Sequence, residues 1–216
     1  MHPQIGRDMS GPLPKAVSAA SRWLIEDWQW PYAGAVTAGF LFVIFPLLWS
    51  AAGLALALVF LQLPVYLVHQ VEEHAADRFR VHMNETIGRG HELLTRPIVF
   101  WTNALLVWVL FLAVLVLGRY VEGSLGLVVV YLTGLNALTH IAGAVVARAY
   151  NPGLWTAIAL MVPAAAAATL VINATARPGP GVQLLAIATA VGAHAALAGL
   201  ILSRMSRPPQ ESGRYR

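Results

Sequence analysis

Residues 54–74 read LALALVFLQLPVYLVHQVEEH, an apolar run that ends in imidazoles and carboxylates. About 20 apolar residues are enough for a helix to cross a lipid bilayer. Successive helical residues are about 100° apart, so His69, Glu72 and Glu73 share one face, whereas His74 points away from it. The stretch therefore predicts a membrane-spanning helix with a polar site near one end.

The composition of the whole chain indicates the same class of protein. Hydrophobic residues make up 58% of the 216 residues and charged residues only 11%. A soluble domain carries about twice that charged fraction. The chain has no cysteine, which excludes disulfides and thiolate metal sites. The net charge of +4 comes from the loops and tails, so it favours membrane topology over nucleic-acid binding.

We therefore expect an all-α fold, a polytopic membrane bundle of six helices. The expected spans are residues 31–50, 53–74, 97–118, 123–147, 154–173 and 182–203. Residues 1–30 would form a tail with an amphipathic helix at the membrane surface, residues 77–96 a polar loop, and residues 204–216 a basic tail. With six spans, twelve Lys and Arg lie on the side of both termini and two on the other side. This asymmetry predicts cytoplasmic termini in a bacterial inner membrane.

Other expected helices carry polar side chains at the depth of this site. Asn136 and His140 share a face of the fourth helix, Asn103 lies near the start of the third, and His194 lies in the cytoplasmic half of the sixth. Lipid cannot form hydrogen bonds with such groups, so we expect them to face one another inside the bundle.

Three short patterns occur in order along the chain: His69-x-x-Glu72-Glu73, Asn136-x-x-x-His140 and Tyr150-x-Pro152-Gly153. With these patterns the chain resembles the HXXEE domain family of integral membrane proteins over roughly His69 to Gly153. The family has been proposed to contain enzymes because of its polar motifs. The resemblance implies that the motif residues form a site, and it specifies no reaction.

Histidine and carboxylate side chains from neighbouring helices suit a divalent metal ion. Zinc is favoured as the metal and iron is the alternative. We expect His69, Glu72 and His140 as ligands, with His194 as a fourth. A catalytic zinc site of this kind keeps one position open for water.

The remaining motif residues would then have catalytic roles. Glu73 would be the general base that acts on the bound water. Asn136 would orient His140 or bind a developing oxyanion, and Tyr150 would cover the site from its loop.

These residues predict a metal-dependent membrane enzyme, a hydrolase that acts on an amphipathic or lipid-soluble substrate in a cleft facing the cytoplasm. A di-metal carboxylate oxidoreductase ranks second, because only one helix carries a pair of acids. A carrier of ions, protons or small molecules would use the same residues, and a scaffold would use them only to hold helices together. The expected partners are the lipid bilayer and a small-molecule substrate, and the sequence does not indicate an oligomeric state.

Overall fold

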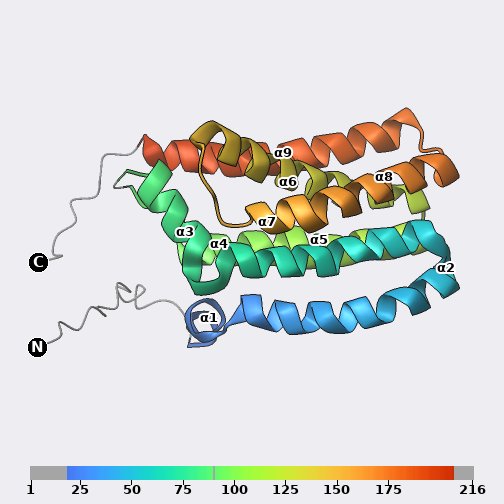
Figure 1. Ribbon diagram of the computed structural model, residues 1–216, viewed down its shortest axis with the longest axis horizontal. Coiled ribbons are helices and arrows are strands. Elements are labelled where there is room, and N and C mark those ends of the chain that lie inside the picture. The colour runs from blue at the N-terminus through green and yellow to red at the C-terminus, as the bar shows by residue number, and fades with distance from the viewer. Residues whose placement is uncertain (1–18, 90, 207–216) are drawn as a thin grey trace, which may run out of the picture.

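The computed structural model describes residues 19–89 and 91–206, and this part of the chain contains helices and no strand (Figure 1). Five helical stretches are long and apolar enough to cross a membrane: Trp30–Ile87, Arg96–Tyr120, Gly123–Ala147, Leu154–Ala176 and Pro180–Met205. They pack side by side in one bundle, which confirms the expected all-α class. The parts of the expected tails at 1–18 and 207–216 lie outside the described residues.

The longest stretch folds back on itself. Helix α2 (Trp30–His74) is preceded by α1 (Ala19–Arg22) and the turn Trp23–Asp27. At Gly53 the backbone leaves helical values, with φ 82° and ψ 164°, a conformation that favours glycine. Figure 1 shows the two arms of α2 running antiparallel on either side of this point. The two arms cover residues 31–50 and 53–74, which were expected as two separate spans, whereas the structure joins them in one helical stretch.

A short connection with helical turns follows α2. The guanidinium of Arg78 donates hydrogen bonds to two carbonyl oxygens in this region, those of Val71 and Ala75, both at 3.0 Å. The Val71 oxygen also accepts from the Ala75 N–H, so the guanidinium adds side-chain hydrogen bonds at the end of α2. The connection then forms α3 (Arg78–His82) and the turn Met83–Ile87. The polar loop expected at 77–96 is therefore partly helical, because apolar side chains within it pack against a buried cluster.

The rest of the bundle consists of α4 (Arg96–Asn103), the turn Ala104–Val109, α5 (Leu110–Tyr120), the turn Gly123–Gly126, α6 (Leu127–Ala147), α7 (Leu154–Thr156), the turn Ala157–Met161, α8 (Val162–Ala176) and α9 (Pro180–Met205). Helix α6 packs against α2, α8 and α9. Small residues on α8, namely Ala164, Ala165 and Ala168, are buried, and they allow neighbouring helices to approach closely.

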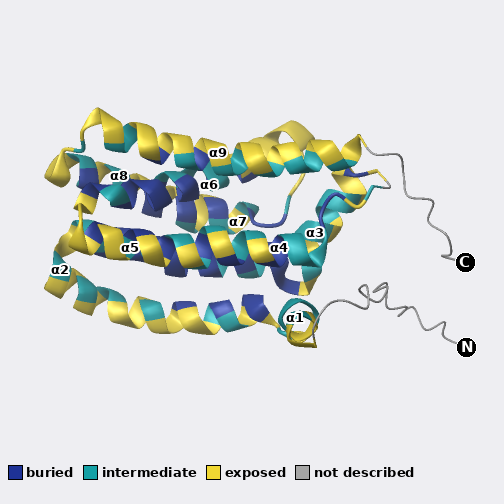
Figure 2. Ribbon diagram, turned by 180° about the vertical axis from the view of Figure 1, so that it is seen from behind, coloured by how far each residue is buried: buried dark blue, intermediate teal, exposed yellow. Residues whose placement is uncertain are grey.

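Apolar side chains also cover the outside of the bundle. Figure 2 shows the exposed residues on the outward faces of the helices and the buried ones between them. Phe40, Val43 and Leu47 on the first arm of α2 are 67%, 75% and 67% exposed. A soluble protein does not expose such a continuous apolar surface, whereas lipid would cover it.

Candidate metal centre

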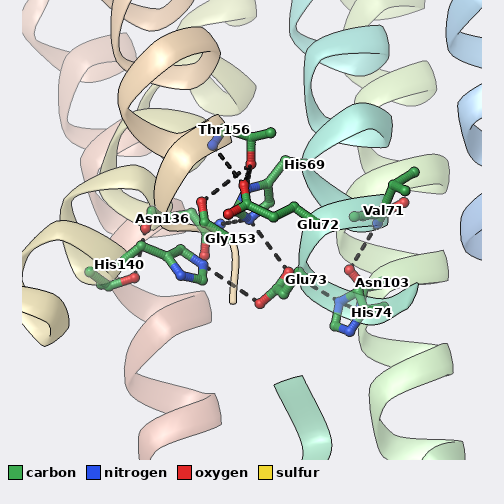
Figure 3. Close-up of polar contacts among 12 residues, drawn as sticks. His69, Val71, Glu72, Glu73, His74, Asn103, Asn136, His140, Gly153 and Thr156 are labelled. Atoms are coloured by element: carbon green, nitrogen blue, oxygen red, sulfur yellow. Dashed lines mark hydrogen bonds and ion pairs between the residues drawn. The ribbon is translucent and has the colours of Figure 1, made fainter. Parts of the chain in front are cut away.

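Two helices bring three titratable side chains together inside the bundle. His69 and Glu73 lie one turn apart on α2, and His140 reaches them from α6 (Figure 3). All three residues are buried, and one ligand atom from each lies within 4.8 Å of the others. Glu73 Oε2 is 3.4 Å from His69 Nε2, and Glu73 Oε1 is 3.6 Å from His140 Nε2. Residues 19–89 and 91–206 contain no other group of this kind.

The ring of His69 is oriented by a threonine of α7, at the start of the fourth long helical stretch. Thr156 Oγ1 lies 2.6 Å from Glu72 Oε2 and 2.9 Å from His69 Nδ1. A hydroxyl has a single hydrogen, and here it is donated to the carboxylate. Thr156 Oγ1 must therefore accept a hydrogen bond from His69 Nδ1–H. The second ring nitrogen, Nε2, then directs its lone pair towards Glu73.

The ring of His140 is oriented in the same way by an asparagine. Asn151 Nδ2 donates a hydrogen bond of 2.8 Å to the backbone oxygen of His140, so its amide oxygen is the free acceptor. This oxygen, Oδ1, is 3.0 Å from His140 Nδ1. The proton of His140 is therefore on Nδ1, and the lone pair of Nε2 faces Glu73.

Two ring lone pairs and a carboxylate thus face one another in a buried place. The Asn136 amide nitrogen, 3.2 Å from His69 Nε2, can donate to one of these lone pairs, and His74 Nε2 lies 3.1 Å from the same carboxylate. A positive charge relieves the remaining repulsion, either a metal ion or a second proton on one of the rings. In a tetrahedral zinc site with bonds of about 2.0–2.1 Å, neighbouring ligand atoms are about 3.3 Å apart. The separations of 3.4 and 3.6 Å, which go to the two different oxygens of Glu73, are close to this value, and one ligand atom of each residue lies within 4.8 Å of the others. The group could therefore hold a metal ion through two imidazoles and one carboxylate.

Gly153 lies against both imidazole rings. Its φ is +101°, which side chains rarely adopt, and a Cβ added there would lie 2.7 Å from Cε1 of His69 and of His140. The loop can approach the two rings only because this residue has no side chain. This close approach explains why glycine ends the Tyr150-x-Pro152-Gly153 pattern.

The site lies within a part of the chain that matches a known protein family. Residues 60–168 match the family described as "Protein of unknown function with HXXEE motif". This chain belongs to that family. The match confirms the resemblance and contains every residue of the three-residue group. No curated protein and no solved structure matches the chain.

The first acid of the HXXEE motif, Glu72, has a different place from the one expected. Its Oε1 accepts hydrogen bonds from the Tyr150 hydroxyl at 2.9 Å and from the Trp155 N–H at 3.1 Å. Its Oε2 accepts from the N–H and the hydroxyl of Thr156, at 2.7 and 2.6 Å. The carboxylate thus caps the amino end of α7, where backbone N–H groups lack partners.

The structure therefore places the two motif acids differently from the expectation that Glu72 is a metal ligand and Glu73 the general base. Glu73, expected as the base, is the acid in the three-residue group, and Glu72, expected as a ligand, is outside it. Adjacent helical residues point about 100° apart, and only the position of α7 decides which of them meets the histidines. Burial and the Glu72 carboxylate raise the pKa of Tyr150, so its hydroxyl remains a hydrogen-bond donor to that carboxylate.

His74, expected to point away from the motif face, in fact contacts Glu73. Its Nε2 is 3.1 Å from Glu73 Oε2. Helix α2 ends there, and the φ of His74, −113°, turns the residue out of the helical direction. The ring is oriented through a chain that begins at the donor-only indole of Trp108, which donates to Gln70 Oε1 at 3.1 Å. Gln70 Nε2 then donates to Asn103 Oδ1 at 2.8 Å, which leaves Asn103 Nδ2 facing His74 Nε2 at 3.0 Å.

The other expected site residues lie around this centre. Asn136 Nδ2 is 3.2 Å from His69 Nε2, so Asn136 contacts His69 and not the expected His140. His194 lines the cavity beside the group, but its Nδ1 is 2.8 Å from the backbone oxygen of Ala190, and it is not part of the group.

Sequence analysis missed Asn151 and Thr156, the two residues that orient the rings. Asn151 occupies the unspecified position x of the Tyr150-x-Pro152-Gly153 pattern. A threonine in the first turn of a helix more often bonds its own backbone, so its type and position carried no signal.

Proposed function

We propose that this protein is a metal-dependent membrane hydrolase that acts on an amphipathic or lipid-soluble substrate. The observation that carries the proposal is the convergence of two ring lone pairs on the buried Glu73 carboxylate. Three protein ligands leave one tetrahedral position open, the arrangement of catalytic rather than structural zinc sites. Zinc is the metal we expect, and iron is the alternative.

The proposed topology has six membrane spans, with the two arms of α2 as the first two. Both termini would then be cytoplasmic in a bacterial inner membrane, because the Lys and Arg are distributed twelve to two across the two sides. The site would lie near the cytoplasmic surface. A cavity of about 620 Å³ beside it, lined in part by Glu73 and His140, would admit the substrate.

The metal would supply a water that is nucleophilic at neutral pH. Glu73 would hold the metal through one oxygen, and its second oxygen would take a proton from the attacking water. Metal binding to His69 Nε2 would release the Asn136 amide, which also lines the cavity, for a hydrogen bond to the substrate. Thr156 and Asn151 would keep the two rings in their ligand tautomers.

A di-metal oxidoreductase is less well supported by this geometry. Such sites need several carboxylates, and among the described residues the group contains one acid. The second motif acid, Glu72, uses both oxygens to cap α7.

The test of the metal site is the metal content of the detergent-purified protein, measured by elemental mass spectrometry. We expect about one metal ion per chain in the wild type, none in a His69→Ala/His140→Ala variant, and an unchanged amount in His194→Ala. The last variant is a matched control, because it removes a cavity histidine outside the group. Equal metal contents in all three proteins, or none in the wild type, would mean that a proton neutralises the group.

Hydrolysis is tested separately by isotope incorporation. The metal-loaded protein is incubated with a membrane lipid extract in H₂¹⁸O, and the released acids are analysed by mass spectrometry. Hydrolysis places one ¹⁸O atom in each acid, and the double variant should give no such product. A metal-loaded protein that yields no labelled product would show that the centre is not hydrolytic.

A further inference from the structure

The cavity beside the three-residue group is lined largely by residues that have no role in the proposed hydrolysis. It is bounded by α3 with the turn after it, by α4 with the following turn, by α6 and by α9. Glu73, Asn136 and His140 form one part of the lining (Figure 3). The volume of about 620 Å³ is in the range of pockets that enclose a small organic ligand.

About half of the remaining lining residues are Ala, Val, Leu or Ile, and they extend along the helices. On α4 and the turn after it, the lining runs from Ile98 to Val107, which is about 13 Å at the helical rise of 1.5 Å per residue. On the facing helices it includes Leu132 of α6 and Leu197 and Ile201 of α9. Aliphatic side chains spread over this length suit an alkyl chain, although Thr102 and Asn103 interrupt them on α4.

The cavity offers an anionic headgroup no permanently charged cation, and its basic side chains are four histidines. Among the described residues, its lining includes neither Lys nor Arg, and Glu73 is the one Asp or Glu. Arg78, which lies close in sequence, donates to backbone oxygens at the end of α2. Sites that transfer phosphoryl groups place Arg or Lys against the phosphate oxygens, and none is present along this lining.

One tyrosine at this cavity has a hydroxyl without a hydrogen-bond partner among the described residues. Tyr66 is 7% exposed and lines the cavity one turn before His69 on α2. Its ring packs edge-on against His69 at 5.5 Å and against Phe111 at 5.4 Å. Its hydroxyl forms no hydrogen bond with another described residue. Gln62 Oε1 is the one fully buried polar side-chain atom without a partner among the described residues, so the Tyr66 hydroxyl oxygen keeps accessible surface. A ligand oxygen in the cavity would supply the missing partner.

We infer that the substrate is an uncharged long-chain acyl ester or amide, an inference that rests on the hydrolase function proposed above. Its alkyl chain lies along Ile98–Val107 and α9, and its carbonyl oxygen accepts a hydrogen bond from Tyr66. Water adds to the carbonyl carbon, the bond from this carbon to oxygen or nitrogen breaks, and the leaving group takes a proton. The products are a carboxylic acid and an alcohol or amine, and no electron donor or acceptor is needed.

The test is equilibrium binding to the purified full-length protein, which requires no turnover. The probe is a tritiated long-chain ketone with a dihydroxypropyl head, in which a methylene replaces the ester oxygen, so that the carbonyl remains and cannot be cleaved. Competitors are the same ketone with a phosphate on its head and a short-chain ketone with the neutral head. We expect each competitor to bind at least about tenfold more weakly than the probe.

Three variants locate the binding site. Tyr66→Phe keeps both ring contacts and should weaken binding about fivefold, the effect of losing one hydrogen bond. Leu106→Trp fills the cavity and should abolish binding, whereas Leu105→Trp places the same bulk on the neighbouring residue, which is 54% exposed and lies outside the lining. The competition with the wild type does not depend on how well the variants fold.

The inference is wrong if the phosphate analogue or the short-chain ketone competes as well as the probe itself, or if the two tryptophan variants bind equally. It can fail independently of the proposed function. A protein that contains metal and forms ¹⁸O-labelled acids but does not bind the ketone refutes this substrate class alone. A protein that binds the ketone at the cavity but contains no metal refutes the hydrolase and supports the acyl-binding cavity.

Discussion

Replacement of Gly153 by alanine should abolish metal binding at the proposed site and leave the bundle folded. Alanine at φ +101° carries backbone strain of about 1–3 kcal/mol. Its methyl group would also lie 2.7 Å from Cε1 of both His69 and His140, and displacing two packed rings costs about 1–3 kcal/mol more. We therefore expect the free energy of unfolding in detergent to fall by about 2–6 kcal/mol. The metal content should fall to near zero, because the rings can make room only by leaving their ligand positions.

Alanine substitutions at two other glycines distinguish the effect of backbone strain from that of steric crowding against the rings. Gly53 also has a positive φ, +82°, but a Cβ added there has nothing within 4 Å, so Gly53→Ala should show backbone strain with full metal content. Gly199 lies in α9 with nothing within 4 Å, and Gly199→Ala should be neutral or slightly stabilising. If Gly153→Ala retained one metal per chain, or lost no more stability than Gly53→Ala, the proposed contact between the loop and both rings would be wrong.

Other substitutions test the remaining parts of the site. Glu73→Gln should eliminate the metal, as measured by elemental mass spectrometry, because an amide replaces the one acid in the group. Glu72→Gln should keep metal but lower the free energy of unfolding by about 1–3 kcal/mol, because it removes the charged cap of α7; equal metal loss in both variants would contradict the different roles of the two acids. Asn151→Leu should weaken metal affinity about 10–100-fold in a chelator titration, since His140 loses the partner of its Nδ1–H. Gln62→Met should change thermal stability by less than about 1 kcal/mol, because the bond that Gln62 donates to α8 is lost together with its buried, unpaired Oε1.

Part of the site could be predicted from the sequence because two of its residues lie close together on one helix. His69 and Glu73 are four residues apart on a helix, so they share a face whatever the rest of the chain does. His140 was predictable for a different reason, since a buried imidazole in a membrane helix has to meet another polar group.

The assignment of the two adjacent acids could not be predicted in this way. Glu72 and Glu73 differ by one helical step, and either could face the bundle interior. Their roles depend on α7, whose amino end lies beside α2 although more than 80 residues separate Thr156 from Glu72. The same holds for Thr156 and Asn151, which determine the ring tautomers through contacts that no sequence spacing encodes.

The sequence by itself determined the all-helical class, the long apolar stretches and the residue types available for a buried site. It could do so because hydropathy and helical periodicity act over a few neighbouring residues. The tertiary structure alone decided which acid joins the histidines, which nitrogen of each ring carries the proton, and that Gly153 must be free of a side chain. These are contacts between α2, α6 and the loop before α7, and they depend on how distant helices pack, to within fractions of an ångström.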